Sequence, residues 1–346
     1  MSLLRALVGA VRSARHAPRL ASGFVPDDDV LLDAPDERLA PALVAAALAD
    51  PEPAAKLLAT TRDGGEWEDR DRYVTRLATF AHSRGDWLTH WLSVAPRDPD
   101  ALLVTTQLAV RRAWESPARA ERLRELGPLI RAVAEEAPQD PVPWRLALDH
   151  ARGAHAGPAV FESLWEQAVR RSPHHYGCHV AALKYLSAQW YGSHRAAFDF
   201  AGQAADDAAP DSLVRALPVR AAYDRLRAEP AEDRAVSLAR VDRAVDRALT
   251  LSARFPANDP WPAEVRNLLA YVLVERGRWE EARAEFGRIG PYATSFPWRG
   301  ARGAGTEDPL RGFLTARDRV RFELARRTPL WGTGVGRAGR GGPGGH

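Results

Sequence analysis

Residues 263–291 read AEVRNLLAYVLVERGRWEEARAEFGRIGP, and this stretch indicates the fold more clearly than any other. Apolar residues recur in it every three or four positions, which is the period of an α-helix with one buried face. The pattern is interrupted at Gly277, where a glycine can adopt the backbone conformation that a tight turn between helices requires. The segment therefore predicts two antiparallel helices, at 262–276 and 278–288, that pack against each other.

The same helical period runs along most of the chain, whereas the alternating pattern typical of β-strands is missing. The other predicted helices are 36–50, 52–61, 66–82, 86–95, 99–115, 118–136, 142–153, 158–171, 176–190, 194–207, 212–228, 232–253 and 308–327. Because the connections between them are short, successive helices should be antiparallel neighbours. The pattern leaves no strands for a parallel sheet, so an all-α fold is expected.

A short phrase marks several boundaries between helices. The sequence APRDP at 95–99 returns as APQDP at 137–141 and, more loosely, as PANDP at 256–260. Its first proline ends a helix, because proline cannot continue the ladder of hydrogen bonds. Its aspartate can accept hydrogen bonds from the free N–H groups of the next helix, and its second proline fits the first turn of that helix. The repeated phrase predicts an array of helical hairpins.

The unit at 263–291 resembles a tetratricopeptide repeat. The residues that match the family's spacing are Ala270, Gly277, Trp279, Ala282 and Phe286. Two positions depart from the family, since Arg266 replaces its early tryptophan and Ile289 its late alanine. The segments 140–173 and 174–210 match more loosely. The resemblance implies an irregular α-α superhelix, or solenoid, of antiparallel hairpins that acts as a non-catalytic scaffold and binds a protein or peptide.

Five parts are expected along the chain. They are a basic helix and linker at 1–35, a helical part at 36–137, tetratricopeptide-like repeats at 138–292, a C-terminal helical cap at 293–331 and a disordered Gly-rich tail at 332–346. Residues 36–137 could be more of the array or a separate cap, and the sequence leaves both possibilities open. The glycines at 332–336 follow no predicted strand and open no helix, so we do not interpret them as a phosphate-binding loop.

Composition and charge indicate a folded chain and argue against some classes of function. Hydrophobic residues make up 45% of the 346 residues and charged residues 27%, which is the balance of a folded globular chain. The net charge of +3 comes from the two ends, since residues 299–346 hold ten arginines against four acidic residues. The acidic body between the ends argues against nucleic-acid binding. Lysine occurs only as Lys56 and Lys184, and we interpret the excess of arginine as a property of a GC-rich coding sequence.

The sequence predicts a cytoplasmic protein. Its only cysteine, Cys178, allows no intramolecular disulfide, which suits a reducing compartment. No apolar run approaches the ~20 residues that a membrane-spanning helix needs. Residues 1–19 form a basic amphipathic stripe, which leaves weak membrane contact as an alternative to a capping helix.

Six of the ten histidines lie within 45 residues, at His150, His155, His174, His175, His179 and His194. His175 and His179 are one helical turn apart, as in two-histidine metal sites, but the H-E-x-x-H pattern and a cysteine pair are both missing. We therefore expect surface and turn histidines, with no metal and no cofactor. The alternative function is an enzyme whose pocket is enclosed by helices around His174, His175, His179 and His194.

The string Trp190-Tyr191-Gly192-Ser193-His194 indicates a helix end, a left-handed glycine and an N-capping serine. It resembles a turn of bacterial helical-repeat proteins, which implies no activity. A Ser193–His194 nucleophile pair is not expected, because adjacent residues at a helix start do not face each other. Cys178 is expected to be a buried thiol rather than a nucleophile.

Other side chains favour structural roles. Trp87, Trp91, Trp114, Trp144 and Trp165 lie on apolar helix faces, so core packing is favoured over a tryptophan-lined groove. The acidic run 27–29 lacks a calcium-loop pattern and is expected to be linker. We expect a partner to meet polar side chains on the first helix of each hairpin, such as His179, Lys184 and Asn267. No catalytic, cofactor-binding or metal-binding residue is predicted.

Overall fold

The computed structural model describes residues 24–228, 236–301 and 307–327, and within these ranges it is almost entirely helical. This confirms the all-α prediction. The helices of the first half are α2 (Leu39–Ala47), α3 (Glu52–Asp63), α4 (Trp67–Ser83), α5 (Asp86–Val94), α6 (Pro99–Glu115), α7 (Arg119–Glu125), α8 (Gly127–Glu136), α9 (Val142–Gly153) and α10 (Pro158–Arg171). Those of the second half are α11 (Tyr176–Tyr185), α12 (His194–Asp207), α13 (Leu217–Arg227), α14 (Leu238–Ser252), α15 (Ala263–Glu275), α16 (Trp279–Ile289), α17 (Ser295–Trp298) and α18 (Pro309–Arg327).

Two short 3-10 helices, η1 (Asp27–Asp29) and η2 (Leu213–Ala216), and two short strands complete the described elements. The basic helix predicted within 1–19 and the Gly-rich tail at 332–346 lie outside the described residues. In the described part of the chain, no helix combines the length and the apolar character needed to cross a membrane.

The helix ends follow the signals in the sequence. Asp98 caps α6 by accepting hydrogen bonds from the N–H groups of Asp100 (2.9 Å) and Ala101 (3.1 Å), as the repeated phrase predicts. Asp140 accepts from the N–H of Val142 at 2.8 Å. The helix predicted at 118–136 is divided at Leu126, because Gly127 and Pro128 start a new helix there.

The turn after α11 differs from the one that the sequence predicts. The helix ends at Tyr185 rather than at Trp190, and Gly192 does not have the positive φ of a left-handed residue. A glycine is required there for another reason, since a Cβ would lie 2.1 Å from the carbonyl oxygen of Leu186. Ser193 caps α12 as predicted, because its hydroxyl accepts a hydrogen bond from the N–H of Ala196.

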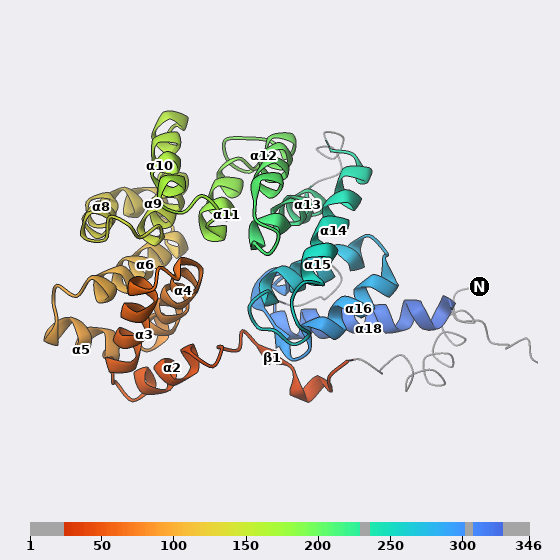
Figure 1. The fold of residues 1–346 in the computed structure, drawn as a ribbon, viewed down its shortest axis with the longest axis horizontal. Coiled ribbons are helices and arrows are strands. Elements are labelled where there is room, and N and C mark those ends of the chain that lie inside the picture. The colour runs from red at the N-terminus through yellow and green to blue at the C-terminus, as the bar shows by residue number, and fades with distance from the viewer. Residues whose placement is uncertain (1–23, 229–235, 302–306, 328–346) are drawn as a thin grey trace, which may run out of the picture.

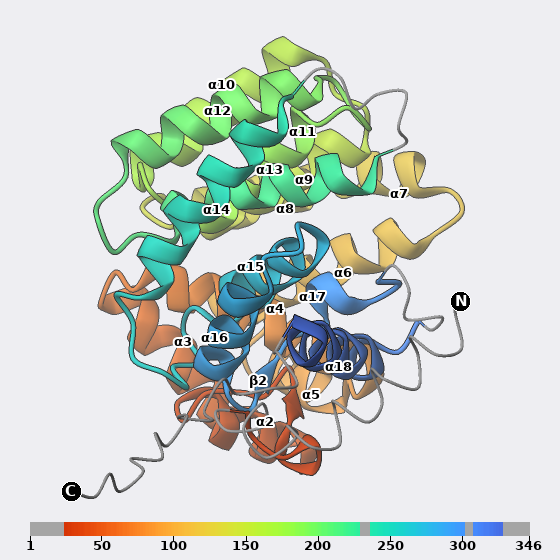
Figure 2. The same cartoon turned by 90° about the vertical axis from the view of Figure 1, so that its right-hand side faces the viewer.

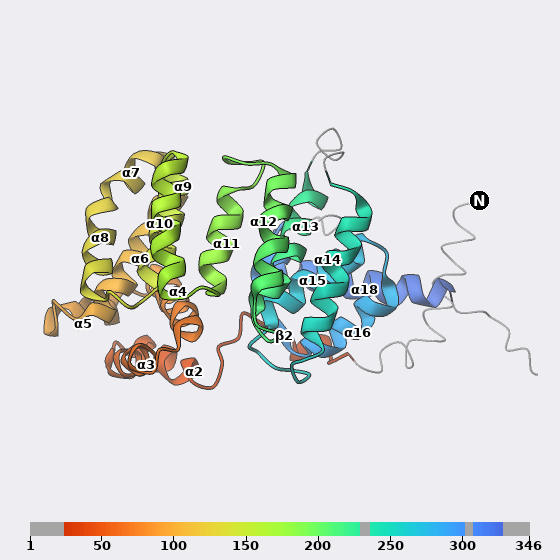
Figure 3. The same cartoon turned by 45° about the horizontal axis from the view of Figure 1, so that its top comes forward.

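The helices follow an arc. Helices α8 to α14 stand side by side in a row, and the chain curves so that α4 and α15 face each other across the inside of the arc (Figures 1 and 3). Seen from the side, the row lies above a second layer that contains α2–α6 and α15–α18 (Figure 2). The hairpin that the sequence marks most clearly is present, with α15 packed on α16 and Gly277 at φ +68° in the turn.

Residues 24–36, here called the closing segment, join the two ends of the arc. Strand β1 (Leu31–Leu32) pairs in parallel with β2 (Tyr292–Ala293), a pairing that the sequence did not predict. The N–H of Asp33 donates to the carbonyl of Ala293 at 2.8 Å, and its carboxylate accepts from the N–H of Ser295 at 3.0 Å. Figure 1 shows the segment passing below the arc from α2 to the C-terminal helices.

Arginines are the most unusual part of the interior. Those buried in the described residues are Arg70, Arg145, Arg152, Arg220, Arg225, Arg266 and Arg317. Arg70 and Arg266 donate hydrogen bonds from all three guanidinium nitrogens and Arg145 from two, in a geometry that the single ammonium of a lysine cannot reproduce. The high arginine content therefore has a structural use here, contrary to our interpretation of it as coding composition alone.

Candidate binding cleft

A cavity of about 390 Å³ lies between α4 and the helices α11, α13 and α15. Its lining combines Glu68, Asp71, Arg72, Thr75, Arg76, Gln107, Arg145, Asp149, Tyr176, Gly177, Val180, Ala181, Lys184, Leu213, Arg220, Trp261, Glu264 and Val265. A second cavity, of about 560 Å³, shares Arg72, Thr75, Arg76, Trp261 and Glu264 with it. The two cavities therefore lie next to each other and share part of their walls, and we call them together the central cleft.

One wall of the central cleft is held by a forked ion pair between α4 and α9. The Nε and Nη2 atoms of Arg145 donate to one carboxylate oxygen of Asp71, at 2.9 and 2.6 Å. The same Nη2 donates to Gln107 at 2.6 Å, and Nη1 lies 3.5 Å from Asp149. Burial would raise the pKa of Asp149, but Lys184, Arg152 and Arg145 hold it below its usual range.

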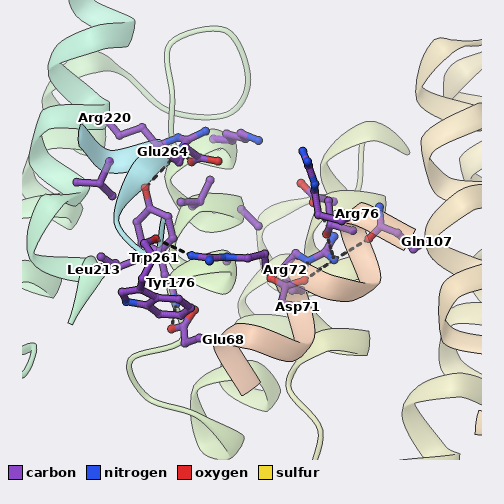
Figure 4. Close-up of a pocket in the computed structure, with 18 residues that line it drawn as sticks. Glu68, Asp71, Arg72, Arg76, Gln107, Tyr176, Leu213, Arg220, Trp261 and Glu264 are labelled. Atoms are coloured by element: carbon purple, nitrogen blue, oxygen red, sulfur yellow. Dashed lines mark hydrogen bonds and ion pairs between the residues drawn. The ribbon is translucent and has the colours of Figure 1, made fainter. Parts of the chain in front are cut away.

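The facing wall is built around a second arginine. Nη1 of Arg220 on α13 donates to Glu264 at 2.6 Å and to the hydroxyl of Tyr176 at 3.3 Å. Burial raises the pKa of Tyr176 to about 12, so this hydroxyl stays protonated at neutral pH. Burial would also raise the pKa of Glu264, but the charge of Arg220 keeps it low, so the carboxylate stays ionised. Figure 4 shows these groups converging from α11, α13 and α15.

Two side chains of α4 connect the walls. Arg72 reaches across to donate to the carbonyl oxygen of Trp261 at 2.5 Å, and its guanidinium lies 4.3 Å from the centre of that indole ring (Figure 4). The carboxylate of Glu68 accepts the N–H of Tyr176, the first residue of α11, at 2.6 Å. An anionic group at a helix N-terminus is stabilised by the helix dipole. These contacts fix the distance between the two walls, so the shape of the cleft does not depend on a bound ligand.

The ammonium of Lys184 is not held by a direct contact inside the cleft. It forms no hydrogen bond and no ion pair with any residue of the described ranges, although the charges of Asp149 and Glu264 lie near enough to stabilise it. Burial lowers its pKa, and the nearby charge of Asp149 opposes that effect. The apolar side chains of Val180, Ala181 and Leu213 line the same cavity. A half-buried ammonium beside an apolar surface is available to an incoming acceptor.

Of the three side chains that we expected a partner to meet, one lies in the cleft and two lie in the core. Lys184 lines the cleft, whereas His179 and Asn267 are buried, at 4% and 0% exposure. The amide of Asn267 donates to the carbonyls of Ala263 and Tyr292 and accepts from the indole N–H of Trp298. It therefore joins α15 to the segment that follows α16 and cannot meet a partner.

The histidines do not converge on one cavity. His174 is exposed, whereas His175, His179 and His194 are buried, which corrects the expectation of surface histidines for these three. The imidazole of His175 caps α11, because its Nδ1 accepts the N–H of Cys178 at 3.2 Å. His179 packs edge-on against Trp165 and parallel to Phe200. None of the four lines either cavity of the central cleft.

Metal and thiol chemistry find no support in the described part of the chain. Its histidine, cysteine and acidic side chains form no group of three or more that could hold a metal ion. Cys178 is fully buried, and burial raises the pKa of its thiol, which is the opposite of what a nucleophilic cysteine needs. Its position confirms the prediction of a buried thiol.

The five tryptophans that we assigned to core packing do pack in or against the hydrophobic core. Trp87 and Trp91 are buried in the core of α2–α9, and Trp114, Trp144 and Trp165 are partly buried against core residues. Trp261, the tryptophan of the cleft, was missed. A signal for the cleft did exist, because Glu68, Asp71, Arg72, Thr75 and Arg76 follow helical spacing and give α4 a polar face away from its apolar one.

The burial of His179 predicts a pH dependence of stability. Burial lowers the pKa of His179 to about 4, below the usual 6.5, so the unfolded chain binds the proton more tightly. As pH falls from 6.5 to 4, His179 takes up a proton in the unfolded chain but not in the folded one, which lowers the free energy of unfolding by up to about 3 kcal/mol. Above pH 6.5 the histidine is neutral in both states and has no such effect. We expect His179→Gln to reduce the loss of stability in that window, measured by urea unfolding at several pH values.

The matched control for this prediction is His90→Gln, which changes an exposed histidine of α5 that is not among the groups acting on His179. It should leave the pH profile as it is. Identical profiles for the wild type and His179→Gln would contradict the prediction.

Comparison of the chain with protein-family models, with curated proteins and with solved structures finds no match.

Proposed function

We propose that this chain is a non-catalytic scaffold of the tetratricopeptide-like type, an irregular α-α superhelix that binds a protein or peptide partner in its central cleft, in the cytoplasm. The observation that carries the proposal is the position of the two cavities, which lie next to each other between α4 and α15 and share five lining residues. A row of adjacent cavities can take successive side chains of an extended polypeptide, whereas a small substrate is usually held in one closed pocket.

The chemistry of the lining supports binding rather than catalysis. The carboxylates of Asp71 and Glu264 are engaged in ion pairs with Arg145 and Arg220, and that of Glu68 is engaged with a backbone N–H. The ion pairs of Asp71 and Glu264 favour a role in positioning other parts of the structure over proton transfer. The four histidines on which an enzyme would depend lie outside the cleft.

Lys184 gives the proposal its sharpest test. Lys184→Met removes the charge while keeping an unbranched stem. The ammonium makes no direct contact in the described ranges and Asp149 keeps its ion pairs with Arg145 and Arg152, so the fold should tolerate the change. We expect the change to weaken the affinity for a cleft-bound peptide about tenfold or more, the effect of losing one hydrogen bond to a charged group. Peptides selected from a random display library against the full-length protein would supply the ligand, and fluorescence anisotropy its dissociation constant.

The control is Lys56→Met, which removes the only other lysine, an exposed residue of α3. It carries the same change in charge but lies outside the central cleft, so the affinity should stay within about twofold of wild type. The proposal fails if no peptide is enriched, or if the two variants bind the selected peptides equally well.

A further inference from the structure

A smaller cavity, of about 270 Å³, lies where the C-terminal end of α14 meets η2. Its lining consists of Pro210, Arg215, Arg247, Thr250, Leu251 and Arg254. It shares no residue with the central cleft. Three of the six side chains are guanidinium groups and none is acidic. Three cations around one small cavity repel one another, and water screens only part of this repulsion because Arg215 and Arg247 are half-buried.

The three arginines, which together form what we call the arginine pocket, are only partly satisfied by the protein. The guanidinium of Arg254, an exposed residue, forms no hydrogen bond or ion pair in the described part of the chain. Arg215 donates to a neutral acceptor, the carbonyl of Ala208, at 3.1 Å. Nη1 of Arg247 is buried and has no hydrogen-bond partner. A buried donor without an acceptor costs about 1–3 kcal/mol, so an acceptor at this position would be stabilising.

Nearby carboxylates do little to neutralise the pocket. Nη2 of Arg247 pairs with Asp206 at 2.6 Å, but the side chain of Asp206 is 66% exposed, so water screens its charge. The end of α14 would normally repel an anion through its free carbonyl oxygens. Here the carbonyls of Ser252 and Phe255 accept hydrogen bonds from the buried guanidinium of Arg266. Arg266 is therefore a fourth arginine at this helix end, and its positive charge offsets the partial negative charge of the carbonyl oxygens.

We propose that the arginine pocket binds a phosphoryl group, carried either by inorganic phosphate or by a phosphate monoester. A guanidinium presents parallel N–H donors that match two oxygens of a phosphate, and such charge-assisted pairs are the stronger kind of hydrogen bond. Arg254 provides a complete fork, while Arg215 and Arg247 provide donors from the two other elements of the pocket. The site is independent of the partner proposed for the central cleft.

The test is isothermal titration of the full-length protein with inorganic phosphate and, separately, with methyl phosphate, at constant ionic strength. We expect saturable binding that Arg254→Gln weakens about tenfold, as the loss of a charge-assisted hydrogen bond implies. Arg215→Gln should weaken it similarly. The matched control is Arg243→Gln, an exposed arginine on the same helix that lies outside the pocket and should bind like the wild type.

The two ligands distinguish the sources of the phosphoryl group. Binding of both would assign the site to phosphate monoesters, and binding of inorganic phosphate alone would assign it to the free anion. The proposal is overturned if neither ligand binds saturably, or if Arg243→Gln weakens binding as much as Arg254→Gln. Circular dichroism of each variant checks that the helices remain, so that loss of binding is not loss of fold.

Discussion

Replacing Arg70 by methionine is expected to lower the free energy of unfolding by about 3–5 kcal/mol. Arg70 is fully buried on α4, where its Nε donates to Asp140 at 2.5 Å and its Nη2 to Asp100 at 2.6 Å. Its Nη1 donates to the carbonyl of Leu58 at 2.9 Å. Methionine would fill most of the volume but leave two buried carboxylates without this countercharge. Urea denaturation followed by tryptophan fluorescence measures the change.

Two further variants identify the cause of the loss. Arg70→Lys keeps the charge but cannot reach three acceptors in different directions, so it should also destabilise, by less. Combining Arg70→Met with Asp140→Asn removes one of the stranded charges and should restore part of the stability. If Arg70→Met unfolds at the same urea concentration as the wild type, the three-way contact does not stabilise the fold.

Replacing Arg266 by leucine is expected to have an effect of similar size, about 3–5 kcal/mol, in the other half of the molecule. The fully buried guanidinium donates to the carbonyls of Pro256 (2.8 Å), Ser252 (2.9 Å) and Phe255 (2.9 Å). The carbonyls of Phe255 and Pro256 have no other donor in the described part of the chain, whereas that of Ser252 also accepts the N–H of Phe255. Leucine would leave the first two unsatisfied, and thermal unfolding by circular dichroism would report the loss.

Arg266→Trp is the informative companion, because tryptophan is the residue that the resembling family has at this position. A tryptophan can donate only one hydrogen bond, so we expect it to destabilise this chain almost as much as leucine. A stable Arg266→Trp protein would mean that the surrounding carbonyls find other donors, and that the family residue is interchangeable with arginine here.

The sequence predicted the helices well because the signals that start and stop a helix are local. Asp98, Ser193 and Gly277 each act within a few residues of their own position, and each does in the structure what its type suggests. One boundary that failed, at Trp190, lies in a turn where Gly192 packs closely on the backbone of Leu186, a contact that no propensity encodes.

The central cleft and the buried arginines were not predictable in the same way, because they depend on contacts between distant residues. Arg145 meets Asp71 across 74 positions, and Arg72 meets Trp261 across 189. His179 and Asn267 were assigned to the surface from their polarity. Their burial follows from acceptors and ring partners that only the folded chain brings together.

The closing segment has a consequence for how the protein is made. Asp33 and Ser295 are 262 positions apart, so the first described residues to leave the ribosome must wait for almost the last before they can pair. During synthesis the N-terminal hairpins can fold early, but the arc stays open until Ser295 has emerged. A nascent chain released before that point would keep its helices and expose β1 as an unpaired edge. Closure of the arc is therefore a late event in synthesis that the N-terminal hairpins cannot complete alone.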